Sequence, residues 1–293
     1  MRKHAGPKFE ALPVAFATAD GLTLAGECRN PQGAPTVLFV HGFGQVRQAW
    51  AGSADALAST GLRCVGFDLR GHGQSDRVAN GDYHLDAFVD DLAAVAAAQP
   101  APPVLVGASM GGLLGLALAG ERTPPPFAAL VLVDITPSWE SAGVQRILGF
   151  MRAHPDGFAD HAAAAAAIAS YLPHRAGRRS AAQLEPLLRR GDDGRLRWHW
   201  DPAMLAPIAD EAERHQPRLA AAARRVEVPV LLLSGGRSDV VSHANVDEFL
   251  QLVPHAQHVE LPHATHMLAG DANDAFTHEI ERFIDTLHPT NHR

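Results

Sequence analysis

The hydrophobic pattern of the chain alternates between short, continuously apolar runs and longer runs rich in Ala and Leu. Uninterrupted apolar runs that end at Gly, Asp or Ser are typical of strands buried on both faces. The expected strands are residues 22–28, 36–40, 63–67, 104–106, 130–133, 230–233 and 258–261. Helical runs separate them, of which residues 85–98 show the clearest helical spacing. This order predicts an α/β fold with a doubly wound, mostly parallel sheet.

Residues 135–226 interrupt this rhythm. They contain no convincing strand and several helical pieces, among them 158–171 and 210–225. A segment of this length is too long for a plain loop in a compact domain. We therefore expect a helical cap, or lid, inserted into a core made of residues 1–134 and 227–293. A separate domain is the alternative, but the insertion has few large apolar residues from which to build its own core.

Composition and charge narrow the classes of partner. The formal net charge is −7 and no long basic run occurs, which argues against nucleic-acid binding. No apolar run is long enough to span a membrane, and two cysteines are too few for a disulfide framework. A cytoplasmic protein acting on a small molecule is expected, and homo-oligomerisation is left open.

The first chemical signal is a candidate nucleophile at Ser109. It lies in Gly107-Ala108-Ser109-Met110-Gly111, which fits G-x-S-x-G and stands between a buried apolar run and a helical one. A strand–turn–helix setting of this kind holds a strained serine at the edge of a sheet, above a helix N-terminus. Without that context the motif would indicate only a glycine-rich turn with an incidental serine.

A second loop offers donors for an oxyanion hole. His41-Gly42-Phe43-Gly44 follows the expected strand 36–40. Acyl transfer needs two N–H groups aimed at the developing negative charge. The backbone N–H groups of Phe43 and Met110 are the candidates. His41 is interpreted as structural, because a histidine at a strand end usually bonds to loop backbone.

The base that a serine needs is expected after the last strand, where two histidines compete. His266 stands deeper in the loop, before Met267, and is preferred as the base. His263 directly follows Pro262, close to the strand end, and is the rival.

The carboxylate that orients the base also has two candidates. In folds of this type the residues follow in the order Ser, Asp or Glu, His. Asp239 lies on the loop after strand 230–233 and is the predicted acid. Asp134 ends strand 130–133 at the same sheet edge and is the alternative, although it could instead cap the entry to the lid.

The 17 histidines raise the question of a metal site. His255 and His258 stand near the start of the last strand, whereas His263 and His266 lie beyond its far end. A five-residue strand is roughly 17 Å long, so these four cannot share one ion. No metal and no cofactor are predicted.

Taken together, these residues resemble the α/β-hydrolase superfamily over about residues 12–135 and 227–288. The resemblance includes residues 41–44, residues 107–112, Asp239 and His266. It also includes the segment 68–75, a structural turn beside the active site in such proteins. It implies an eight-stranded, mostly parallel sheet with a cap after the sixth strand. Within the superfamily the chain looks like the group of esterases, lactonases, carbon–carbon bond hydrolases and cofactor-free perhydrolases.

The expected lid holds three of the four tryptophans of the chain. The candidate substrate contacts are Trp139, Phe150, Trp198, Trp200 and, beside the base, Met267. Packing of the tryptophans between lid and core is an equally good interpretation. Arg47 could bind a substrate carboxylate, but an exposed surface role is favoured.

These features predict a serine hydrolase that cleaves a small or medium-sized carboxylic ester through an acyl-enzyme. Carbon–carbon bond hydrolysis, lactone hydrolysis and perhydrolysis use the same triad and are the first alternatives. A non-catalytic binding protein on a hydrolase-like fold is the second.

Overall fold

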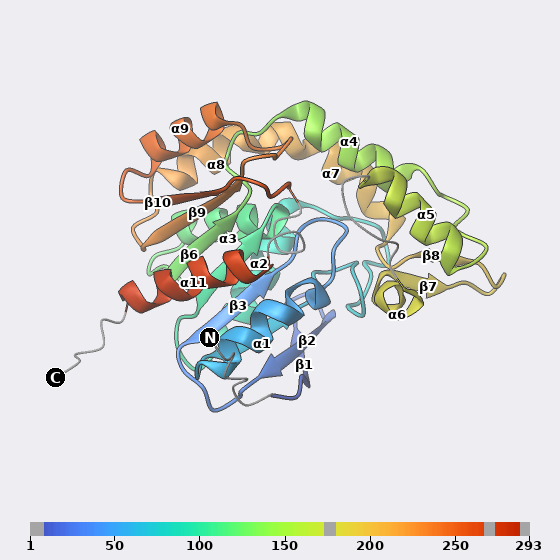
Figure 1. Cartoon of the computed structure of the whole chain (residues 1–293), viewed down its shortest axis with the longest axis horizontal. Helices are drawn as coiled ribbons and strands as arrows, with labels where there is room; N and C mark the ends of the chain where they lie inside the picture. Colours follow the sequence, from blue (N-terminus) through green and yellow to red (C-terminus); the bar gives the residue numbers. More distant parts are fainter. Residues whose placement is uncertain (1–8, 173–179, 267–272, 288–293) are drawn as a thin grey trace.

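A computed structural model describes residues 9–172, 180–266 and 273–287 of the chain. At its centre is an eight-stranded sheet with the order β1-β2-β4-β3-β5-β6-β9-β10 (Figure 1). The strands are β1 (Leu12–Ala17), β2 (Thr23–Arg29), β3 (Thr36–Val40), β4 (Arg63–Phe67), β5 (Val104–Ala108), β6 (Ala129–Val133), β9 (Val230–Gly235) and β10 (Gln257–Leu261). β2 runs antiparallel to both of its neighbours, and the other paired strands are parallel.

Helices cover both faces of the sheet, as the uninterrupted apolar strands predict. Successive strand residues alternate between two core clusters: Leu38 and Val40 join one, Val37 and Phe39 the other. The first cluster includes residues of α2 (Leu85–Ala97), α3 (Met110–Glu121), α8 (Gln216–Ala223) and α9 (His243–Leu252). The second includes residues of α1 (Ala51–Ser59) and α11 (Asn273–Leu287). The sheet is therefore doubly wound.

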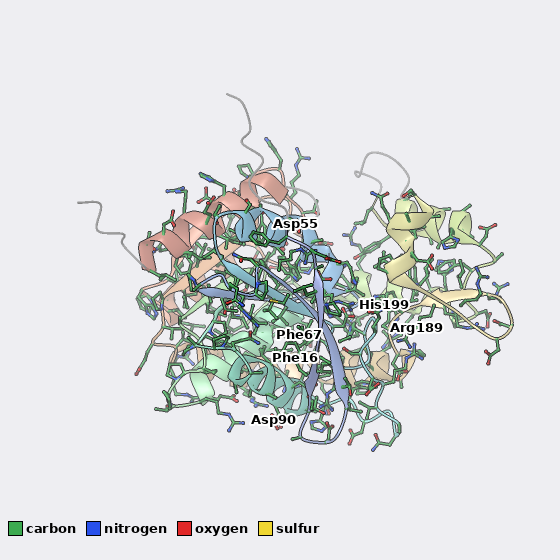
Figure 2. All side chains as sticks on the ribbon, turned by 90° about the horizontal axis from the view of Figure 1, so that it is seen from below. Phe16, Asp55, Phe67, Asp90, Arg189 and His199 are labelled. Atoms are coloured by element: carbon green, nitrogen blue, oxygen red, sulfur yellow. The ribbon has the colours of Figure 1, made fainter. Side chains whose placement is uncertain are left out.

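The expected strands are all present, with ends that differ by one or two residues. The strand that the apolar pattern did not predict is β1, at the edge of the sheet. Its residues are mostly exposed or half-buried, so it lacks the continuous apolar run of a central strand. Phe16 anchors it by packing edge-on to Phe67 of β4, with ring centroids 6.2 Å apart (Figure 2).

The segment between β6 and β9 is mainly helical, and most of it lies at one end of the molecule (Figure 1). It comprises α4 (Ser141–Arg152), α5 (His161–Tyr171), α6 (Ala181–Leu184), α7 (Leu205–Glu211) and α8. Contrary to expectation, it also contains an antiparallel hairpin of β7 (Leu188–Arg190) and β8 (Leu196–Trp198). Strands of three residues are too short to show a period of two in the sequence.

The last helix of this segment, α8, packs closely against α3 of the core: a Cβ at Gly120 would come within 2.1 Å of the Ala222 carbonyl oxygen. Among the described helices, none has the length and apolar character needed to cross a membrane.

Candidate active site

Ser109 occupies a sharp turn between β5 and α3. Its backbone angles, φ 48° and ψ −121°, place a non-glycine residue in a strained region. The neighbouring glycines allow this turn, because a Cβ at Gly107 would come within 2.6 Å of the Gly111 backbone. A Cβ at Gly111 would come within 2.5 Å of the carbonyl oxygen of Val40. The elbow predicted from G-x-S-x-G is therefore present, and Ser109 lines a large cavity.

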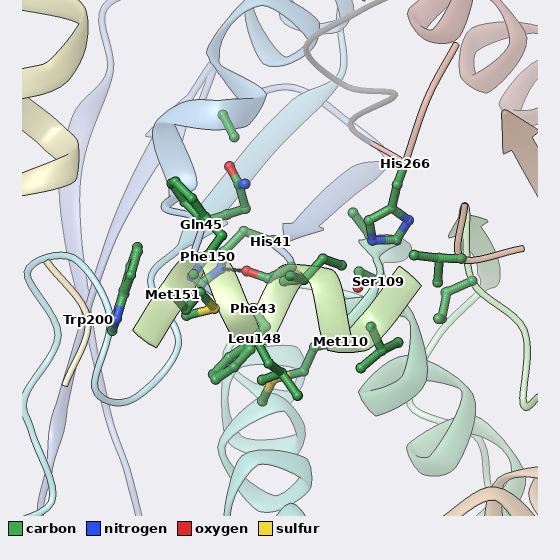
Figure 3. A pocket seen from close by; sticks show the side chains of 18 of the residues that line it. His41, Phe43, Gln45, Ser109, Met110, Leu148, Phe150, Met151, Trp200 and His266 are labelled. Atoms are coloured by element: carbon green, nitrogen blue, oxygen red, sulfur yellow. Dashed lines mark hydrogen bonds between the residues drawn. The ribbon is translucent and has the colours of Figure 1, made fainter. Parts of the chain in front are cut away.

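His266 lies above this serine. Figure 3 shows its imidazole ring directed toward the Ser109 side chain from the loop that follows β10. Its Nδ1 is 2.8 Å from Oδ2 of Asp134. Because a carboxylate accepts hydrogen bonds, Nδ1 carries the proton, and Nε2 is left free to accept one. His263, the rival base, lines the same cavity but is exposed.

Asp134 is held by a network that fixes its carboxylate. The residue follows β6, is fully buried and has φ 50°. Its Oδ1 accepts the N–H of Gly235 at 2.7 Å, and its Oδ2 accepts the hydroxyl of Ser238 in addition to His266. Buried carboxylates require such donors, and these three come from the end of β9, the loop after it and the loop after β10.

The structure pairs His266 with Asp134, the alternative acid, and gives Asp239, the predicted acid, a different partner. Its Oδ2 lies 2.7 Å from Nη2 of Arg146 on α4, and its side chain is 37% exposed. Both aspartates stand at the correct edge of the sheet. The neighbouring Ser238 was not predicted as a site residue. Its hydroxyl donates to Asp134.

The predicted oxyanion loop lies against the nucleophile. A Cβ at Gly42 would come within 3.1 Å of the Ser109 Cβ. Phe43 and Met110 both line the cavity beside the serine (Figure 3). Met110 is the first residue of α3, and the first N–H groups of a helix have no partner within it.

His41 has the structural role that was predicted for it. It is 1% exposed, and its Nε2 accepts the N–H of Leu69 at 3.0 Å. Its Nδ1 therefore carries the hydrogen and donates to the carbonyl oxygen of Gly42 at 2.8 Å. Burial lowers the pKa of His41 to about 4, so the ring is neutral at pH 7.

The cavity above the serine has a volume of about 1260 Å³ and is roofed by aromatic residues. The lid residues predicted to contact substrate all line it: Trp139, Phe150, Trp198 and Trp200. The tryptophans are also buried, so the packing interpretation holds for them as well. Met267 lies outside the described residues.

Other lining residues were not predicted. Tyr171 stacks on Phe150, with centroids 4.3 Å apart, and Met151 lies beside Gly44. Arg47 neither contacts the cavity nor lies exposed: it is buried and binds Asp68 and Gln74. Within the described ranges, no group of three or more His, Cys, Asp or Glu side chains could hold a metal ion.

Comparison with known proteins identifies the fold. A family model described as the alpha/beta hydrolase fold matches residues 35–272. A 3-hydroxybutyrate-oligomer hydrolase of Cupriavidus necator is 28% identical over 255 residues, which cover 82% of this chain and 84% of the relative. An esterase of Mycobacterium tuberculosis is 28% identical over 270 residues, covering 86% and 84% of the two chains.

A solved structure shows the same architecture. That of an E-2-(acetamidomethylene)succinate hydrolase has a TM-score of 0.80 and 25% identity, covering 94% of this chain and 100% of the other. These relatives are esterases and hydrolases, which supports a hydrolase activity here. The sheet order, the elbow at Ser109 and the matched family model agree, and the chain belongs to the α/β-hydrolase fold family.

Proposed function

We propose that this protein is a serine hydrolase that cleaves carboxylic esters through an acyl-enzyme. One observation carries the proposal: His266 faces the strained Ser109 while its Nδ1 is bonded to the buried Asp134. This is the nucleophile, base and orienting acid of a catalytic triad, in the chain order Ser, Asp, His.

In the acylation step, the Oγ of Ser109 attacks the ester carbonyl carbon, and Nε2 of His266 takes the hydroxyl proton. Asp134 keeps Nδ1 protonated and stabilises the imidazolium that forms. The tetrahedral intermediate then expels the alcohol, which receives its proton from His266. The acyl group remains on Ser109.

The negative charge of the intermediate develops on the former carbonyl oxygen. We assign its stabilisation to the N–H groups of Phe43 and Met110, with the positive end of the α3 dipole behind Met110. The contact of Gly42 with Ser109 supports this assignment, since it brings the loop to the nucleophile. A water deprotonated by His266 then releases the acid and restores the serine.

The cavity suggests which acyl groups fit. Its volume of about 1260 Å³ exceeds the roughly 300–1,000 Å³ of typical small-ligand sites. Two pairs of flat rings line it, Phe150 on Tyr171 and Trp198 on Trp200, each pair 16° from parallel. We therefore propose residues 135–226 as a lid over the site. We also propose esters with a bulky apolar acyl group as substrates, at or above the upper end of the small to medium-sized range expected from the sequence.

The test compares the protein with its Ser109→Ala variant on p-nitrophenyl esters of increasing acyl size. We expect the variant to lose about 10⁴-fold or more in kcat, because the nucleophile is absent. Ser59→Ala at the end of α1, far along the chain from the elbow, is the control and should keep full activity. Near wild-type turnover by Ser109→Ala would overturn the proposal.

A fluorophosphonate probe separates the enzyme from a binding protein of the same fold. Labelling of Ser109, detected by intact mass, requires an activated serine, and a pure binder should stay unlabelled. A panel of esters, lactones and vinylogous diketones then separates ester cleavage from lactone and carbon–carbon hydrolysis by the ratio of kcat/KM values.

A further inference from the structure

Three buried histidines surround the proposed oxyanion loop, residues 42–44. His41 follows β3, His72 belongs to the turn after β4, and His199 follows β8 in the lid. Each is at most 1% exposed. Their rings form a row, with centroids 5.0 Å apart between His41 and His72 and 6.0 Å apart between His72 and His199.

Gly44 is bonded on both sides by two of these rings. Its N–H donates to Nε2 of His72 at 3.1 Å, and its carbonyl oxygen lies 3.2 Å from Nε2 of His199. Nδ1 of His199 accepts the N–H of Gly73 at 2.8 Å. The lone pair of His199 is thus on Nδ1, and its Nε2–H donates to Gly44.

The same loop is fixed one peptide earlier. The carbonyl oxygen of Gly42 accepts hydrogen bonds from Nδ1 of His41 and from the N–H of Gln45. In a trans peptide the N–H points opposite to the carbonyl. The bonds to the Gly42 carbonyl therefore set the direction of the Phe43 N–H in the same peptide, and the bonds to Gly44 hold the two peptides that follow it.

His199 is the ring of this row that comes from the lid. It stands between Trp198 and Trp200, which line the cavity, and its ring packs edge-on to Trp200 at 5.3 Å. Figure 2 shows His199 close to Arg189, where the lid meets the core. Arg189 ties the lid to the same turn, through Nη2 and the Gly73 carbonyl oxygen at 2.6 Å, and no described contact links it to residues 42–44.

We propose that His199 is a positioning residue for the reaction: by holding the Gly44 carbonyl, it keeps the Phe43 N–H aimed at the oxyanion. This rests on the proposed ester hydrolysis. It also means that the tryptophans of the lid and the oxyanion hole are placed by one side chain. Binding the acyl group against Trp198 and Trp200 then favours the loop geometry that stabilises the transition state.

The experiment compares His199→Phe, which keeps a flat ring but no hydrogen bond, with Arg189→Met, which removes a lid contact without touching Gly44. We expect His199→Phe to lower kcat about 10- to 100-fold, less than the 10²–10³-fold loss of a whole oxyanion donor, with KM changed by less than about threefold. Its affinity for a trifluoromethyl ketone that forms a tetrahedral adduct on Ser109 should fall in parallel. Arg189→Met should keep kcat within about twofold.

Two amide variants separate the two bonds of His199. An Asn side chain can place its oxygen near the Nδ1 position and keep the Gly73 bond, whereas Gln can place its NH₂ near Nε2 and keep the Gly44 bond. We expect His199→Gln to retain a higher kcat than His199→Asn. These variants keep the proposal testable even where His199→Phe fails to fold, which its thermal midpoint would reveal.

The outcomes are distinguishable. Absence of ester hydrolysis and of probe labelling in the wild-type protein contradicts the proposed function itself. An active wild type with equal kcat losses in His199→Phe and Arg189→Met, or with Asn retaining more kcat than Gln, overturns the role of His199 alone.

Discussion

Two groups of histidine interactions lie near the same cavity, and they are built on opposite principles. Beside Ser109, at the edge of the sheet, His266 bonds to a carboxylate and keeps its second nitrogen toward the cavity. At the junction of core and lid, His41, His72 and His199 have both nitrogens engaged by backbone groups. The first arrangement leaves a nitrogen able to exchange a proton, and the second leaves none.

The difference shows what assigns a role to a histidine. Residue type does not, because the chain has 17 histidines. Burial is a weak criterion too, since the His266 side chain is only 11% exposed. The partners decide: a carboxylate supports a charged imidazolium during turnover, whereas a backbone N–H that donates to the ring demands that it stay neutral.

Among changes to the partners of these histidines, the largest expected effect comes from changing the partner of His266. In Asp134→Asn, the Gly235 N–H requires an oxygen at the Oδ1 position, which turns the amide NH₂ toward His266. The NH₂ would donate to Nδ1 and place the imidazole proton on Nε2. Nε2 could then no longer accept the proton of the serine hydroxyl. We expect kcat to fall by about 10³- to 10⁴-fold, measured on the best ester of the panel.

A loss of less than tenfold in that variant, with an unchanged thermal midpoint, would contradict the assignment of Asp134 as the orienting acid. Because Asn tolerates positive φ, the substitution leaves the backbone of the turn unstrained. The measurement therefore reports on chemistry rather than on folding.

The three buried histidines at the junction of core and lid should make the stability of the protein depend on pH. Burial lowers the pKa of His41 to about 4 and of His72 to about 3, and lowers that of His199 well below its usual range. The charged side chains nearest these rings are Arg47, Asp68 and Arg189. Below pH 6.5 the unfolded chain takes up protons that the folded rings do not, so stability falls as the pH drops.

Between pH 7 and 5.5 we expect each ring to lower the free energy of unfolding by about 1 kcal/mol, or about 3 kcal/mol for the three rings together. Urea denaturation at several pH values measures this. His199→Phe removes one titrating ring and should lose about a third of the dependence. An unfolding free energy that stays constant over this range would show that the rings are not held neutral.

The sharp turn at Ser109 could be predicted from sequence because its constraints are local. The glycines, the apolar run before Ser109 and the helix after it all stand within a few positions. The carboxylate partner of His266 could not be predicted, because Asp134 and Asp239 both follow a strand at the same edge. Their partners separate them. Gly235 and Ser238 donate hydrogen bonds to Asp134, whereas Arg146 of α4 forms an ion pair with Asp239.

The contact between His199 and Gly44 was equally hidden in the sequence. Trp198 and Trp200 stood out as candidate substrate contacts, but the Gly44 carbonyl lies 155 residues away from His199 along the chain. Such a contact exists only once the β7–β8 hairpin is docked on the core. The strands of that hairpin are too short for their alternation of polar and apolar residues to be recognised in the sequence. The fold of the core was therefore predictable, while the way the lid meets it was not.

The smallest expected effect is that of changing Asp239, the second aspartate at the sheet edge that carries His266 and Asp134. Asp239→Asn makes the same chemical change as Asp134→Asn, but at a carboxylate whose partner, Arg146, is 51% exposed. Ion pairs this open to solvent contribute only about 0–1 kcal/mol, so stability should change by less than about 1 kcal/mol. Arg146 keeps its place over the Tyr171 ring, 5.1 Å from its centroid, so α4 should keep its position.

We expect the kcat of Asp239→Asn to change by less than about threefold, with KM the more sensitive parameter because Asp239 lines the cavity. A loss of kcat comparable to that of Asp134→Asn would mean that His266 changes partner during turnover, and the two aspartates would then have to be assigned a shared role.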